Sequence, residues 1–99
     1  MSILKVSVGM GEKSILKVSI RQVKAARALL GWSQDDLARA AEVSIPTIKR
    51  LEALDGPLGG RGQTAERIVA AIMSEGVEFI DENGGGPGVR LRKPTRQKR

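Results

Sequence analysis

The stretch SQDDLARAAEVSIPTIKRLE, residues 33–52, decides the fold of this chain of 99 residues. Ser33 is a residue type that caps helix N-termini, and the carboxylates of the first turn lie where the positive end of a helix dipole favours them. The buried positions predicted for this helix are Leu37, Ala38 and Ala41. Only residues 42–44 separate it from a second helix, so the two helices must cross steeply.

The second helix of the stretch carries apolar residues at helical spacing, and the breaker Asp55-Gly56-Pro57 ends it. Its apolar positions are Pro46, Ile48, Leu51 and Leu54. At the crossing, the small side chain of Ala38 allows close helix approach, and Val43 fills the corner beneath the turn. This combination of a tight turn and small residues at the crossing predicts a helix-turn-helix.

A further helix is expected before this pair. Ser19 followed three residues later by Gln22 is a capping-box pattern, in which the hydroxyl and the amide satisfy backbone donors at a helix start. Gly31 is expected to end this helix in the left-handed conformation that glycine adopts readily. The buried positions predicted for it are Val23, Ala26 and Leu30.

The part of the chain after the pair is expected to form one more helix and a β-hairpin. After the glycine-rich residues 56–63, Thr64 is the expected N-cap and Gly76 the expected end. The apolar stripe of this helix is Ala65, Ile68, Val69, Ile72 and Met73. Two segments in which apolar and polar side chains alternate with period two then predict the two strands of the hairpin. Its inward-facing residues are expected to be Val77, Phe79, Val89 and Leu91.

At the N-terminus, the segment SILKVS occurs twice, at residues 2–7 and 14–19. Its β-branched residues favour strands, while a loosely ordered arm is the alternative. The fold class predicted is α+β and mainly α, with four or five short helices and a small hairpin or sheet from the termini. The expected organisation is an arm or strands at 1–18, a helix-turn-helix domain at 19–76, a hairpin at 77–92 and a basic disordered tail at 93–99.

The composition narrows the possible functions. The chain has no Cys and no His, so it lacks a thiolate nucleophile, an imidazole base and the usual zinc ligands, which argues against an enzyme, a metal or another cofactor. No apolar run is long enough to span a bilayer, and no signal-peptide core is recognisable, so a cytoplasmic protein without a membrane partner is expected.

The formal charge of +6 is concentrated at the C-terminal end. Residues 1–89 hold 11 basic and 11 acidic residues, so the excess positive charge lies in residues 90–99. Such a distribution favours a polyanionic partner, nucleic acid before membrane. The alternative is that the basic end only keeps a small protein soluble.

Residues 33–52 resemble the helix-turn-helix of the Cro and cI repressors of bacteria and phages, the XRE family, which has the lambda-repressor-like fold. The likeness implies that the second helix of the pair enters the major groove of double-stranded DNA. The base-reading residues that it implies are Ser44, Ile45, Pro46, Thr47, Lys49 and Arg50. Phosphate contacts are expected from Ser33, Gln34, Lys49 and Arg61. The resemblance also implies a partly buried structural ion pair between Arg27 and Glu52.

The reading positions combine apolar and basic side chains. Ile45 and Pro46 offer apolar atoms that suit a thymine methyl, whereas Arg50 can form a bidentate pair with guanine. Lys49 can reach a phosphate or a base. Glu42 departs from the family because it stands where glycine is common, and a residue with a side chain at positive φ costs about 1 kcal/mol.

From these features we expect a sequence-specific transcriptional regulator, a dimeric repressor that occludes promoters at an inverted repeat, its own promoter included. The half-sites of such an operator lie about 34 Å apart, one turn of DNA. One alternative is an antitoxin or restriction-controller type of regulator with an additional protein partner. Another is an RNA or protein interaction module on the same fold.

Overall fold

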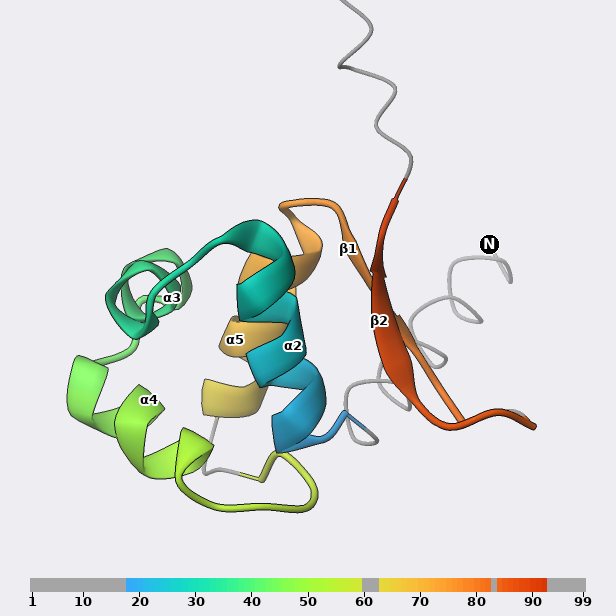
Figure 1. The fold of residues 1–99 in the computed structure, drawn as a ribbon. Coiled ribbons are helices and arrows are strands. Elements are labelled where there is room, and N and C mark those ends of the chain that lie inside the picture. Colours follow the sequence, from blue (N-terminus) through green and yellow to red (C-terminus); the bar gives the residue numbers. More distant parts are fainter. Residues whose placement is uncertain (1–17, 60–62, 83, 93–99) are drawn as a thin grey trace, which may run out of the picture.

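The computed structural model describes residues 18–59, 63–82 and 84–92. Within these ranges, four helices are followed by an antiparallel two-stranded hairpin (Figure 1). The elements are α2 (Ile20–Leu30), α3 (Gln34–Ala41), α4 (Ile45–Glu52), α5 (Thr64–Met73), β1 (Val77–Ile80) and β2 (Gly88–Leu91). The predicted class, α+β and mainly helical, is confirmed. Most of the predicted N-terminal arm, Arg61 and the tail at 93–99 lie outside the described residues.

Helices α2 and α5 form the middle of the domain, with α3 and α4 on one side and the hairpin on the other (Figure 1). Helix α3 packs against α4 and α5, whereas β2 lies against α2 and β1 against α5. The buried core consists of Val18, Ile20, Val23, Ala26, Leu37, Ala38, Ala41, Ile48, Leu51, Leu58, Ile68, Val69, Ile72 and Val77. None of the helices in the described ranges is long and apolar enough to cross a membrane.

The first two helices begin at the predicted caps. The Ser19 hydroxyl accepts a hydrogen bond from the Gln22 N–H (3.1 Å), and the Gln22 side chain accepts from the Ser19 N–H (2.9 Å). Gly31 ends α2 with a φ of 69°. A second capping box joins Ser33 to Asp36, and the hydrogen bond from the Ser33 N–H lowers the pKa of the Asp36 carboxyl. The starts of α2 and α3 are therefore set by interactions three residues apart.

The side chain of Gln22 also ties α2 to the hairpin. Its amide nitrogen donates to the Gly88 carbonyl (2.8 Å) and to the Ile80 carbonyl (3.2 Å), which belong to residues paired in the strand register. The residue is 5% exposed, and its amide oxygen serves the capping box. The capping pattern predicts only the role of the amide oxygen, because the hairpin carbonyls are distant in sequence.

Helix α4 is shorter than predicted. It ends at Glu52, and Leu54, which was expected in the core, is 57% exposed. The chain turns back after α4 because the Ile20 N–H donates to the Gly56 carbonyl (2.9 Å). The Leu58 N–H donates in turn to the Val18 carbonyl (2.9 Å), and Leu58 lies in the core in place of Leu54.

Three further local predictions are wrong. Thr64 is the first residue of α5, and its N-cap is Gln63, whose side chain makes no capping hydrogen bond. Met73 and Leu91 are 44% and 48% exposed, although both were expected to face the core. Met73 is the last residue of α5, and Leu91 lies opposite the buried Val77 in the strand register.

Candidate nucleic-acid interface

Helix α4 has one face in the core and the opposite face in solvent. Its buried residues are Ile48, Leu51 and Glu52. Its exposed residues, at positions i, i+1, i+4 and i+5 of the helix, are Ile45, Pro46, Lys49 and Arg50. Within the described part of the chain, neither Lys49 nor Arg50 takes part in an ion pair. Both cations are therefore available to an external anion or to a base edge.

Ser44 fixes the start of α4. Its hydroxyl oxygen accepts from the Thr47 N–H (3.3 Å), and its hydroxyl proton is donated to the Thr47 hydroxyl oxygen (2.8 Å). Pro46 lies in the first turn, where its missing N–H leaves no hydrogen bond unmade. Ser44 is exposed, whereas Thr47 is half-buried at the side of the helix.

The turn between α3 and α4 is held from two sides. Glu42 has a φ of 59°, the left-handed conformation that the family resemblance implied at this position. The Val43 N–H donates to the Ala38 carbonyl (2.9 Å), and Arg67 of α5 donates to the Glu42 carbonyl (3.2 Å). The Arg67 hydrogen bond was not predicted. It links α5 to the turn and so helps to orient α4.

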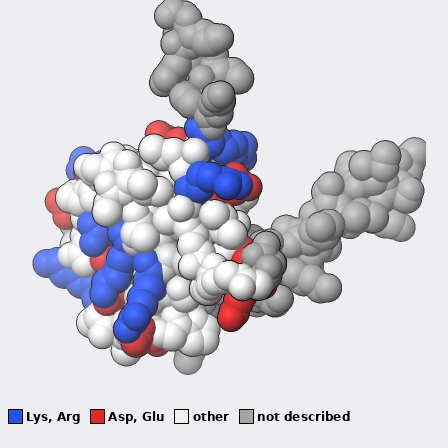
Figure 2. All heavy atoms as spheres, turned by 45° about the vertical axis from the view of Figure 1, so that its right-hand side comes forward, with Lys and Arg blue, Asp and Glu red and all other residues white. Residues whose placement is uncertain are grey.

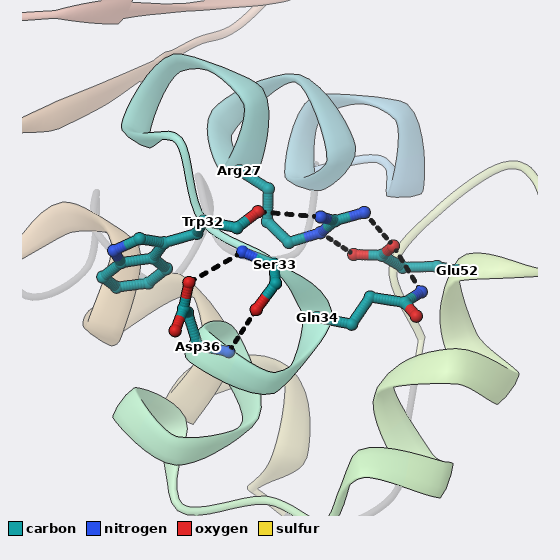
Figure 3. Close-up of polar contacts among 6 residues, drawn as sticks. All are labelled: Arg27, Trp32, Ser33, Gln34, Asp36 and Glu52. Atoms are coloured by element: carbon teal, nitrogen blue, oxygen red, sulfur yellow. Dashed lines mark hydrogen bonds and ion pairs between the residues drawn. The ribbon is translucent and has the colours of Figure 1, made fainter.

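Three helices meet at the carboxylate of Glu52 (Figure 3). Arg27 of α2 donates Nε to Oε2 (2.9 Å) and Nη2 to Oε1 (2.8 Å), and Gln34 of α3 donates its amide to Oε1 (3.0 Å). Arg27 also donates to the Trp32 carbonyl (2.9 Å). The side chains of Glu52 and Arg27 are 5% and 21% exposed. The Arg27–Glu52 contact is thus a bidentate, largely buried ion pair behind the exposed face of α4.

The surroundings of Glu52 keep it ionised. Burial raises the pKa of this carboxyl, but the hydrogen bonds from Arg27 and Gln34, together with the nearby positive charges of Arg27 and Lys24, outweigh burial, so its pKa lies below the ordinary value. The hydrogen bond to Glu52 in turn raises the pKa of Arg27. Both groups are charged at neutral pH and compensate each other. The ion pair therefore positions the helices and leaves no free charge for a ligand.

The residues expected at phosphates have different surroundings. The Ser33 hydroxyl is engaged in the cap of α3, and Lys49 is exposed on α4. The amide nitrogen of Gln34 donates a hydrogen bond to Glu52. The groups of Gln34 that take no part in this bond are its amide oxygen and its backbone N–H at the start of α3. Arg61 lies outside the described residues. No local sequence signal indicates the Gln34–Glu52 hydrogen bond, because the partners are on different helices.

The side of the molecule that carries the hairpin has mixed charges (Figure 2). Acidic side chains lie next to basic ones, and uncharged surface covers much of the rest of this view. Two of the ion pairs of the domain join Arg21 to Asp55 and Arg90 to Glu78, each at 3.2 Å. Arg90, which the sequence groups with the basic end, is therefore part of the hairpin and paired with an acid.

The comparisons with known proteins agree with this geometry. The Helix-turn-helix family model matches residues 23–57, which run from the first turn of α2 to just beyond α4. No curated protein matches the sequence. The matched range includes α3, the turn at Glu42, the whole of α4 and the pair formed by Arg27 and Glu52. Residues 23–57 therefore match a helix-turn-helix family, which supports the resemblance of the chain to the XRE, or Cro/cI, type.

Proposed function

We propose that this protein is a sequence-specific transcriptional regulator, a homodimer that represses promoters, its own included, from an inverted-repeat operator in the bacterial nucleoid. The observation that carries the proposal is the outer face of α4. There, Lys49 and Arg50 extend from a helix whose opposite face is anchored in the core. A helix presented in this way fits the width of the major groove of DNA.

Each side chain has a distinct part in the proposed complex. Arg50 forms a bidentate pair with guanine, worth about 1–3 kcal/mol of discrimination against other bases. Lys49 contacts a phosphate or a neighbouring base. Phosphates on the flanking backbone are held by Ser33 and Gln34 at the start of α3, where backbone N–H groups and the helix dipole favour an anion, and by Arg61.

The dimer follows from the small size of one reading helix. One helix contacts too few base pairs to select a site among the many competing sites of a genome. Two copies related by a two-fold axis read two half-sites about 34 Å apart, which doubles the number of base pairs read. A repressor acts here by occupying the promoter. Sedimentation of the protein on its operator duplex measures the stoichiometry.

The test is a footprint on the DNA upstream of the protein's own gene, together with selection from random duplexes. We expect a protected inverted repeat, and we expect the double variant Lys49→Ala/Arg50→Ala to lose specific binding without a change in melting temperature. Arg21→Ala is the matched control, since it removes an exposed cation on another helix. Wild-type binding by the double variant would contradict the proposal, and retention of RNA binding alone would favour an RNA-binding module.

A further inference from the structure

The front of α4 is apolar, whereas its second turn is basic. Ile45 is 37% exposed and is among the few large apolar side chains at the surface of the described residues. Pro46 beside it is exposed and has no N–H to donate. Lys49 and Arg50 follow one turn later on the same face. The first part of the helix to meet a base therefore presents carbon atoms.

The hydroxyl groups near this front are already engaged. Ser44 donates its proton to the Thr47 hydroxyl oxygen (2.8 Å) and accepts the Thr47 N–H (3.3 Å). Ser44 must break a bond within the protein before it can donate to a base, and Thr47 is half-buried at the side of the helix. The hydroxyl proton of Ser44 is therefore engaged within the protein, whereas the side chains of Ile45 and Pro46 are exposed and apolar.

An open hollow gives access to the side chain of Ile45. It lies between α3 and the start of α4, and its lining includes Ala38, Val43 and Ile45. Asp35 and Arg39 of α3 and Ser44 at the start of α4 also border it. A group that projects from a base edge can therefore lie against Ile45 without displacing any residue of the core.

In the major groove, the one apolar group on a base edge of unmodified DNA is the C5-methyl of thymine. The geometry points to a methyl-reading subsite: Ile45 and Pro46 bind the C5-methyl group of a pyrimidine, thymine in unmodified DNA. This inference rests on the proposed DNA-binding function and names part of its operator. The subsite discriminates by burying a methyl group, so affinity depends on the methyl more than on a hydrogen bond at that base pair.

The spacing along α4 also places this thymine relative to the guanine of Arg50. Ile45 and Pro46 precede Lys49 and Arg50 by one helical turn. One turn rises about 5.4 Å and successive base pairs about 3.4 Å, so the two bases are about one or two base pairs apart in each half-site. The expected half-site therefore contains a thymine close to a guanine.

The test replaces thymine by uracil, which removes only the C5-methyl. The full-length protein first selects its operator from random duplexes, and each thymine of the half-site is then exchanged for uracil. At the thymine bound by the subsite we expect about a fourfold loss of affinity, the effect of one buried methyl group. In the variant Ile45→Ala/Pro46→Ala, the difference between thymine and uracil should disappear. In Lys49→Ala, overall affinity should fall while the difference persists.

The outcomes separate this inference from the proposed function. If an operator is bound but no uracil exchange changes affinity by as much as twofold, the methyl-reading subsite is wrong and DNA binding stands. An unchanged thymine preference in Ile45→Ala/Pro46→Ala also overturns it. If no duplex is selected at all, the proposed function fails and the inference fails with it.

Discussion

Replacing Arg27 by alanine should destabilise the domain because it leaves the carboxylate of Glu52 buried without its main partner. In the native protein, two nitrogens of Arg27 lie 2.8 and 2.9 Å from the two oxygens of Glu52. After the replacement, only the amide of Gln34 remains as a donor from another helix, at 3.0 Å. The Arg27 side chain does not face DNA in the proposed complex, so the effect is on folding.

The expected size of the effect follows from burial. Breaking a buried ion pair by removing one partner costs about 3–5 kcal/mol. Since the Arg27 side chain is 21% exposed, water can reach the vacated site, and we expect the lower end, about 3 kcal/mol. For a domain of this size, that loss lowers the melting temperature by about 12–24 °C.

Arg21→Ala is the matched control for this experiment. Arg21 also forms an ion pair between α2 and the region of α4, at 3.2 Å from Asp55, but the two side chains are 80% and 68% exposed. Exposed pairs of this kind contribute less than about 1 kcal/mol. Urea denaturation of both variants at neutral pH compares the two free energies of unfolding directly. Equal losses for Arg27→Ala and Arg21→Ala would refute the assignment of a buried pair.

The pH dependence gives a second test of the same reasoning. Because the pKa of Glu52 is lowered on folding from its ordinary value of 4.5, its contribution to stability is present above that value and is lost as pH falls through the folded pKa. In acid, a protonated Glu52 is no longer an unpaired charge, so the destabilisation by Arg27→Ala should shrink. A penalty that is the same at neutral pH and at about pH 3 would contradict this account.

Three other changes probe separate parts of the chain. Gln22→Leu removes the donor to two hairpin carbonyls and the acceptor of the Ser19 N–H in the capping box. We expect a decrease of about 1–3 kcal/mol in the free energy of unfolding by urea, together with faster amide exchange in the hairpin. A decrease no larger than that of Arg21→Ala would refute this role. Glu42→Gly removes the side chain that is strained in the left-handed conformation, at a φ of 59°, and should raise the free energy of unfolding by about 0.5–1 kcal/mol. A lower melting temperature of this variant would contradict the prediction. Removing residues 93–99 deletes four basic residues. The slope of log affinity against log salt concentration should then flatten by about 0.9 for each phosphate that these residues neutralise. An unchanged slope would mean that the tail does not contact DNA and only keeps the protein soluble.

The sequence alone determined the starts of α2 and α3 and the helix-turn-helix. The caps at Ser19 and Ser33 and the left-handed residue Gly31 were predicted where the structure has them, and the family resemblance implied the left-handed conformation at Glu42. These features depend on hydrogen bonds and steric limits within three or four residues of the chain. Local sequence is therefore enough to predict these caps and turns. Most of the buried apolar positions of α2, α3 and α4 could also be predicted, from their helical spacing.

Tertiary packing decided what the local pattern leaves open. The early end of α4, the exposure of Leu54 and the burial of Leu58 follow from backbone hydrogen bonds with the segment around the start of α2. Gln22 donates a hydrogen bond to a carbonyl 66 residues later in the sequence, and Gln34 donates one to Glu52, 18 residues later in the sequence. The partners of such side chains depend on how the helices and the hairpin pack in three dimensions, which helical or strand periodicity does not encode. Residue spacing therefore predicts which face of α4 is exposed, whereas the packed domain determines what holds that face in place.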